Sequence, residues 1–382
     1  MTASERIRAA QVSVHRANLY SASATISPAV TMTALSTARR TTYLNIKLDR
    51  GLNEIFGKTY TKNQRIAQVL NRINPGYRDD GLSQSAINGA WKAEKLEIEL
   101  GGKGTVKWTK AQRKELLETG RVKGYEGHHQ QSVKYHSEEQ ANPDNIKLYS
   151  HKDHLKEGHH GDYKNESDAP MYDRRQRLIR TKRKSVIKNE LLGGTIVAVV
   201  SFITSAGLRF VIEMVKSNRN PEDVKKAGIL AVREGAEAAG YALISYGLAR
   251  VSVLGVKKVF EIKGIKLASN AMKWVEGGIA AVAIAIAVGV ITYIKLRING
   301  YGRKDAFKEA GKVAIGGLAI GMISLIISIN FGTAWAIGFN VVVAVGSLFF
   351  ILYEVVHEKR LVEKLQVYTI QEMTRRCLPV AA

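Results

Sequence analysis

The hydrophobic pattern divides the chain into two unlike parts. Residues 1–190 are charged and moderately apolar, whereas residues 191–356 are rich in Ala, Val, Ile and Gly. From Val313 to Tyr353 there are 41 consecutive residues without a charge, about twice the ~20 that one membrane-spanning helix needs. Because Asn330-Phe331-Gly332-Thr333 lies at the middle of this run, we predict two spans joined by a tight turn. Residues 277–294 also lack charges and predict a third span.

Small residues in these segments favour close helix packing in lipid. They recur every four residues in one span and form a Gly-x-x-x-Gly motif in another: Gly277, Ala281, Ala285 and Gly289, and Gly317 with Gly321. Residues 191–208 and 227–256 are weaker candidates, because charges follow the first and interrupt the second. We expect an α-helical membrane region over 191–356 with at least three spans, and a cytoplasmic tail over 357–382.

The N-terminal part predicts short helices rather than spans. Residues 1–40 are rich in Ser, Thr and Ala without a sustained apolar period, and we expect a flexible tail there. A small helical region, residues 41–105, should contain helices over 61–74 and 83–98, which we interpret as a packing unit rather than a helix-turn-helix. The apolar face of the first would be Ile66, Val69, Leu70 and Ile73, with Thr61 as its N-cap. A further helix over 108–119, capped by Thr109 and ended by Gly120, opens the next region, residues 106–170.

Charge and cysteine content narrow the partners. The net charge of +23 indicates polyanionic partners, either nucleic acid or anionic lipid. A basic run, Arg174 to Lys184, lies in a linker over residues 171–190; it could be a solvated helix face, a DNA-backbone contact or a juxtamembrane segment, and its position favours the last. The single cysteine, Cys377, excludes an internal disulfide framework and any multi-cysteine zinc site. No apolar stretch typical of a cleaved secretion signal occurs in the first thirty residues.

Histidines cluster in the middle of the chain. Of nine histidines, seven lie between residues 128 and 160. A one-metal phosphodiester nuclease needs a divalent ion on the scissile phosphate, a neutral imidazole to take a proton from water, and a group that orients this imidazole. The alternative is a structural zinc site, which usually recruits cysteine. Since no cysteine lies nearby, we favour the nuclease.

Three blocks within residues 120–168 resemble the HNH (His-Me finger) nucleases, most closely the Gly-His-His group of bacterial polymorphic toxins and more distantly the colicin DNases. These blocks are Gly124 to His136, with Gly127-His128-His129 at its centre, Asn142 to Leu148, and His154 to Asn165. The resemblance implies a ββα-metal core. The expected fold class is therefore α+β: a small helical N-terminal region, the ββα-metal core, and an α-helical transmembrane region.

The resemblance also implies roles for individual residues. His128, His154 and His159 would hold one divalent ion (Mg, Mn, Ni or Zn), His129 would be the general base, and Asn145 would fix the hairpin around that base. Asn165 matches a downstream Asn of related sequences, without a defined role. One departure stands out: His154 and His159 are five residues apart, about 140° round an ideal α-helix. Gly158 could break the helix and return His159 to the metal, and His160 is the alternative ligand. For His136 and His151 we expect exposed or strand-end positions.

The function implied is a membrane-anchored, metal-dependent endonuclease that cleaves DNA with little sequence preference, as a bacterial toxin or an anti-phage defence effector. We expect it at the bacterial inner membrane with the nuclease facing the cytoplasm, and with an immunity protein as a further partner of a toxin. The alternative is a colicin-like pore-former, since Val313 to Tyr353 resembles a channel-forming hydrophobic hairpin; the HNH-like part would then be regulatory or vestigial.

Overall fold

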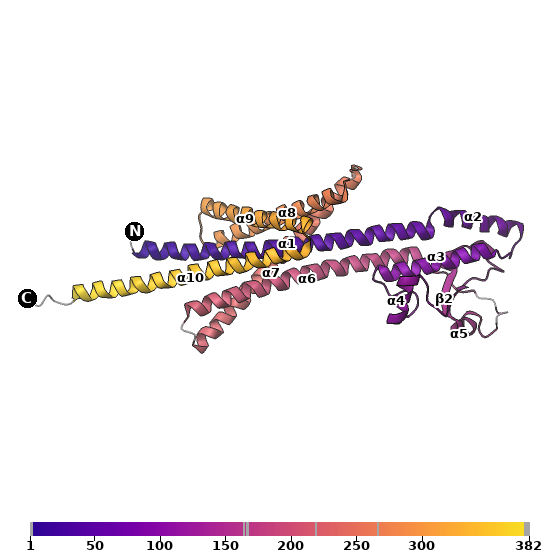
Figure 1. The fold of residues 1–382 in the computed structure, drawn as a ribbon, viewed down its shortest axis with the longest axis horizontal. Helices are drawn as coiled ribbons and strands as arrows, with labels where there is room; N and C mark the ends of the chain where they lie inside the picture. Colours follow the sequence, from indigo (N-terminus) through magenta and orange to yellow (C-terminus); the bar gives the residue numbers. More distant parts are fainter. Residues whose placement is uncertain (1–2, 163–164, 166–167, 218–219, 266, 378–382) are drawn as a thin grey trace, which may run out of the picture. The chain divides into compact units, whose positions relative to one another are not determined.

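The computed structural model describes residues 3–162, 165, 168–217, 220–265 and 267–377. It is mostly helical, with one small two-stranded sheet (Figure 1). The chain divides into two compact units: a terminal unit, residues 1–38 with 191–382, and a central unit, residues 39–190. The expected α+β class is confirmed.

The central unit contains the C-terminal part of α1 (Ala3–Phe56), the N-terminal part of α6 (Arg174–Lys216), and the elements between them. These elements are α2 (Lys58–Ile73), α3 (Asp80–Glu99), α4 (Lys110–Thr119), β1 (Tyr125–His129), β2 (Ile146–Ser150) and α5 (His151–Asp153), with single turns at Ser137–Glu139, Pro143–Asn145 and His154–Gly158. The sheet is an antiparallel hairpin in which His129 pairs with Ile146 and Tyr125 with Ser150. Its core is a cluster of aromatic and aliphatic side chains that includes Trp91, Trp108, Leu116, Ile146 and Leu148.

Local capping explains where these helices begin and end. Thr109 caps α4 by accepting a hydrogen bond from the backbone N–H of Gln112, whose side chain in turn accepts from the Thr109 N–H. Gly120 ends α4 in the left-handed conformation, with φ of 82°. This helix is the one expected over 108–119. The helix expected over 61–74 begins earlier, at Lys58, and most of its apolar face is exposed, up to 75% at Ile73.

The structure has a helix where a flexible tail was expected. Residues 3–40 all belong to α1. Val30, Ala34 and Ala38 are at most 2% exposed and belong to the core of the terminal unit, which also contains Ala242 and Ala249. Small residues at four-residue spacing let helices approach closely, but they give only a weak hydrophobic period. The hydrophobic pattern therefore did not predict this helix, which is stabilised by packing against other helices.

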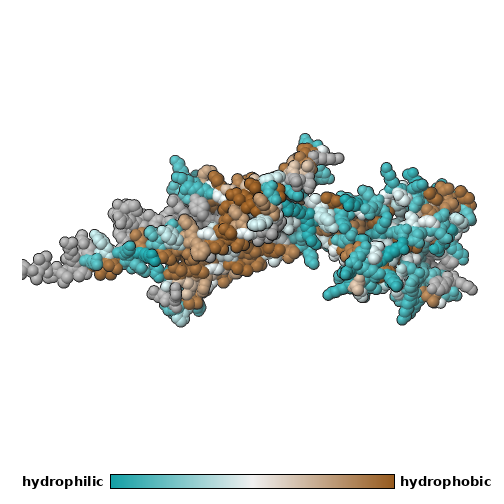
Figure 2. Space-filling view, viewed as in Figure 1, coloured by the Kyte–Doolittle hydropathy of each residue, from teal (hydrophilic) through white to brown (hydrophobic). Residues whose placement is uncertain are grey.

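Among the described residues, the terminal unit contains five helices long and apolar enough to cross a membrane, and at most 39% of the apolar window of each is buried. They are α6, α7 (Pro221–Ile262), α8 (Ser269–Ile298), α9 (Arg303–Asn330) and α10 (Thr333–Cys377). The three expected spans are confirmed as long apolar helices, and both weaker segments join them. Apolar side chains gather on the outside of these helices (Figure 2), as lipid contact requires, and this indicates membrane association.

Small residues bring α8 and α9 together. A Cβ on Gly277 would collide with Leu325, and a Cβ on Gly289 would lie 3.0 Å from that of Ala314. The tight turn expected inside the uncharged run lies between α9 and α10, where Gly332 has φ of 95°. Two of the charges that interrupt α7 are paired with α8: Lys295 contacts Glu237 at 3.1 Å and Glu234 at 3.4 Å. Pairing is the usual way in which charges are accommodated between apolar helices.

The basic run begins as part of the interior of the central unit rather than on a solvated face. Arg174, 2% exposed, donates hydrogen bonds to the carbonyls of Pro143 and Ile146, and its Nη1 lies 3.7 Å from Oε2 of Glu94. Glu94 is fully buried and also accepts from Nε1 of Trp108 at 2.7 Å. The first turn of α6 is thereby fixed to the hairpin through long-range contacts.

Candidate metal centre

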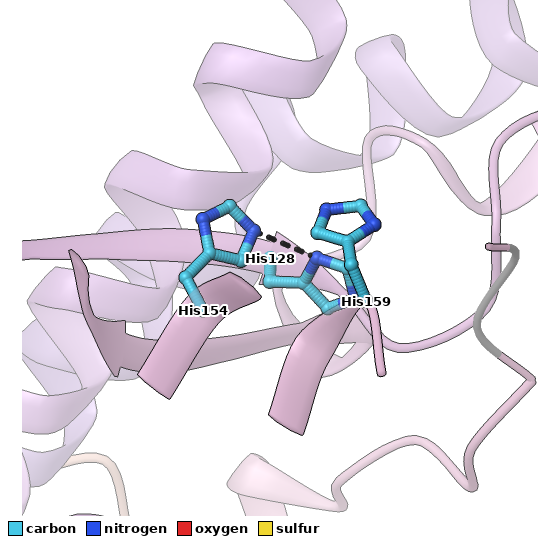
Figure 3. A group of neighbouring side chains, drawn as sticks. All are labelled: His128, His154 and His159. Carbon is cyan, nitrogen blue, oxygen red and sulfur yellow. Dashed lines mark hydrogen bonds between the residues drawn. The ribbon is translucent and has the colours of Figure 1, made fainter. Parts of the chain in front are cut away.

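Three histidines from two separate elements converge at one point of the central unit. His128 lies in β1, His154 begins the turn that follows α5, and His159 comes directly after that turn. One ring nitrogen from each lies within 4.8 Å of the others. Nδ1 of His128 is 2.9 Å from Nε2 of His154, and the three rings face a common space (Figure 3). The structure thus brings together the three ligands inferred from the resemblance.

A π-turn explains how histidines five residues apart reach the same point. The backbone N–H of His159 donates to the carbonyl of His154 at 3.1 Å, an i to i+5 hydrogen bond, within the π-helical turn His154–Gly158. This wider turn places His159 above His154 rather than about 140° away. Gly158 is buried here, and a Cβ on it would lie 3.0 Å from Cδ2 of His154. His160 has φ of 48° and is not one of the three.

Hydrogen bonds at the far sides of the rings fix which nitrogens carry protons. Oε1 of Glu126 accepts from Nδ1 of His154 at 2.8 Å, and the carbonyl of Asn165 accepts from Nδ1 of His159 at 3.3 Å. A carboxylate and a carbonyl can only accept here, so both Nδ1 atoms carry the proton and both Nε2 atoms keep a lone pair. This is the arrangement of a histidine metal ligand held by an outer partner. Asn165 closes the loop by donating to the His159 carbonyl at 3.0 Å.

Sequence reasoning missed Glu126. The sequence did contain an indication of its role. Glu126 lies two residues before His128 in β1, and side chains two residues apart lie on the same face of a strand. Glu126 also accepts from Nδ1 of His151 at 3.0 Å, which gives that exposed histidine a contact within the site. These hydrogen bonds, the one from His151 foremost, hold the pKa of Glu126 below its usual value and keep it ionised.

Burial keeps His128 neutral. Its pKa is lowered to about 3 by burial first, and then by the neighbouring His154 and His159. A neutral imidazole is the form that binds a metal. Three imidazoles around one space, two of which donate hydrogen bonds from their outer nitrogens, fit a divalent ion such as Zn²⁺ or Ni²⁺. The donor set and its outer partners therefore fit a resident metal ion.

His129 is the next residue, but it is not one of the three. It is 7% exposed, and its Nε2 donates to the backbone carbonyl of Gln140 at 3.2 Å. Burial lowers its pKa to about 4, against a smaller opposing effect of that hydrogen bond. The ring is therefore neutral at physiological pH, with the proton on Nε2 and a lone pair on Nδ1.

Asn145 fixes the loop that orients His129. It is fully buried, its Oδ1 accepts from the N–H of Gln131 at 2.8 Å, and its Nδ2 donates to the Gln131 carbonyl at 3.1 Å and the Glu139 carbonyl at 3.4 Å. These bonds close the loop between β1 and β2, in which Gln140 follows Glu139. Asn145 is thereby placed to hold this loop in position.

Comparison with known proteins agrees with this geometry. Residues 81–150 match the family model described as a GHH signature containing HNH/Endo VII superfamily nuclease toxin. The segment is a GHH nuclease toxin domain. The chain is also 29% identical to mouse (Mus musculus) teneurin-1 over 118 residues, which are 30% of this chain and 4% of teneurin-1. No solved structure matches the chain.

The GHH domain, as the family model delimits it, contains His128, His129 and Asn145 but ends at Ser150. His154 and His159 follow directly after it, on the turn that completes the three-histidine group. The candidate metal centre therefore combines the hairpin of the GHH domain with the short segment that follows it.

Proposed function

We propose that the GHH domain is a metal-dependent endonuclease that hydrolyses DNA phosphodiesters while the terminal unit holds it at a membrane. One observation carries the proposal: His128, His154 and His159 place three ring nitrogens within 4.8 Å of one another. The adjacent His129 is a buried, neutral imidazole with its ring held by a carbonyl. This pairing of a ligand group with a base is what hydrolysis of a phosphodiester requires.

His128, His154 and His159 would hold the divalent ion, which when bound would polarise the scissile phosphate and stabilise the leaving oxygen. His129 would accept a proton on Nδ1 from the attacking water, whose oxygen forms the new bond to phosphorus as the bond to the leaving oxygen breaks. The Gln140 carbonyl would hold the Nε2 proton and stabilise the imidazolium that results. Asn145 would keep the Gln140 loop in place.

The apolar helices support a membrane location for this chemistry. We propose the bacterial inner membrane, with the GHH domain on the cytoplasmic side, where it would meet DNA. The family description favours a toxin, for which an immunity protein would be a partner; an anti-phage effector is the other role. A pore-forming activity is a second candidate, because α9 and α10 form an apolar helical pair joined at Phe331-Gly332.

Four full-length chains expressed in bacteria and purified in detergent test the proposal: wild type, His129→Ala, His159→Ala and, as a matched control, His160→Ala. We expect the wild type and His160→Ala to nick plasmid DNA with an added divalent metal. His129→Ala should lose cleavage but keep its bound metal, whereas His159→Ala should lose both. Equal metal loss in the His129 and His159 variants would contradict the division between base and ligand. The DNA and the membrane potential of the bacteria that express each chain are measured as well. If the DNA stays intact with all four chains while the membrane potential collapses, the pore-forming activity is favoured.

A further inference from the structure

A basic groove lies in the central unit, beside the start of α6. Its volume is about 700 Å³. One wall is the loop Gly101, Gly102 and Lys103, and the other is the face of α6 that carries Arg180, Lys184 and Lys188. The α6 wall lies beyond residues 81–150 and so outside the matched family segment. The mechanism proposed above uses none of these residues.

The groove carries an excess of positive charge, because five basic side chains line it against two acidic ones, Glu97 and Asp173. Arg177 also lines it, but its Nε is paired with Oε2 of Glu97 at 2.6 Å. Among the described residues, no ion pair joins any of the other four basic side chains to an acidic one; they are Lys103, Arg180, Lys184 and Lys188. This excess of positive charge in one recess favours a polyanion as its occupant.

Two glycines make the recess. Gly101 has φ of 88°, and a Cβ on it would lie 2.8 Å from Oγ of Ser185. A Cβ on Gly102 would lie 2.8 Å from Cγ2 of Thr181. The loop therefore packs directly on the Thr181 and Ser185 side chains of α6, and Ser185 donates a hydrogen bond to the Leu100 carbonyl. The walls are fixed against each other, so the cations are held in a groove rather than spread over a mobile surface.

The spacing of the cations matches a nucleic acid strand. Arg180, Lys184 and Lys188 recur every four residues and share one face of α6. They span about 12 Å along the helix, at a rise of about 1.5 Å per residue. One strand of a duplex presents about one phosphate per 3.4 Å of axis, which is three or four phosphates over this length.

We propose that this groove binds the phosphate backbone of the nucleic acid, beyond the bond that is cut, so that Lys103, Arg180, Lys184 and Lys188 hold the flanking strand. The inference rests on the proposed nuclease function. The recess and the regular spacing of its cations favour nucleic acid over anionic lipid, which would need only a convex basic face.

Binding is tested with the full chain in neutral detergent, a fluorescent 30-base-pair duplex, and EDTA to prevent cleavage. The variants are Lys184→Glu and Lys188→Glu. The matched control is Arg183→Glu, which makes the same charge change on the neighbouring exposed residue of α6, outside the groove. Anisotropy at several salt concentrations should show roughly tenfold weaker binding for each groove variant and a salt dependence reduced by about one released ion. Arg183→Glu should change affinity by less than about threefold.

Equal weakening by Lys184→Glu and Arg183→Glu would overturn the proposal, because it would reflect net charge alone. Unchanged DNA affinity would overturn it as well. If Lys184→Glu instead weakened retention of phosphatidylglycerol by the chain in nanodiscs, the groove would be a lipid site. Thermal melting of each variant verifies that it is folded. Plasmid nicking with metal is measured separately, so loss of the proposed cleavage is distinguished from loss of groove binding.

Discussion

Removing the Glu126 carboxylate should weaken metal binding without removing a ligand. Oε1 of Glu126 accepts from Nδ1 of His154 at 2.8 Å, which keeps the lone pair of His154 on Nε2, 2.9 Å from Nδ1 of His128. In Glu126→Ala, His154 is released to rotate and to protonate either nitrogen. Loss of an outer partner of this kind typically costs 10- to 100-fold in metal affinity or activity, about 1.4–2.8 kcal/mol.

The metal affinity of Glu126→Gln separates the contribution of the Glu126 charge from that of the His154 ring orientation. The Glu126 side chain is 40% exposed, so solvent screens its charge, and orientation should account for most of the effect. A glutamine oxygen still accepts from Nδ1 of His154. Glu126→Gln should therefore lose roughly threefold in affinity, well short of the loss in Glu126→Ala.

Isothermal titration of the metal-free full chain with Zn²⁺ or Mn²⁺ measures this effect, with plasmid nicking as a second readout. His151→Ala is the control, because it removes the other donor to the same carboxylate at 3.0 Å and leaves the His154 contact intact; its metal affinity should stay within about twofold. Unchanged affinity in Glu126→Ala would refute the reasoning. A greater loss in His151→Ala than in Glu126→Ala would also refute it.

Three further predictions concern packing around the site. Gly158→Ala places a methyl group 3.0 Å from Cδ2 of His154, so its metal affinity should fall roughly tenfold, measured by the same titration. Asn145→Ala leaves three backbone groups of a buried loop without their partner and should lower the free energy of unfolding by roughly 3 kcal/mol, measured by urea denaturation. Glu94→Gln removes the carboxylate paired with the buried Arg174 guanidinium; it should cost roughly 3–5 kcal/mol in the same assay, and a loss below about 1 kcal/mol would contradict the cost assigned to the lost counter-charge.

Elements with local signals could be predicted from the sequence. The helix α4 is delimited by Thr109 and Gly120, whose side chain and backbone freedom act within a few residues. The spans α9 and α10 follow from the absence of charge and from one glycine turn at Gly332. Both kinds of signal depend only on neighbours in the chain, and α4, α9 and α10 form where these signals place them.

Elements determined by distant partners could not be predicted in this way. Arg174 is the first residue of a basic run, and nothing beside it in the sequence shows that it is buried against Glu94, 80 residues earlier. The N-terminal part of α1 is a similar case, because its helix depends on packing of Val30 and Ala34 against helices far along the chain. Local composition indicated solvent exposure at both places, and long-range contacts changed the outcome.

The spacing of the two later histidines shows where sequence reasoning reached its limit within the site. An α-helix would place ligands at positions i and i+4, and His154 with His159 breaks this rule by one residue. Two solutions were open: a helix break that recovers His159, or use of His160. The structure takes a third, an i to i+5 turn that keeps the backbone hydrogen-bonded from His159 to His154. A π-turn costs stability in an isolated helix, so its presence here depends on the surrounding contacts, in particular the burial of Gly158 against His128 and His154. The absence of a side chain at residue 158 thus favours the turn that brings His159 to the metal centre, since a Cβ there would lie 3.0 Å from Cδ2 of His154.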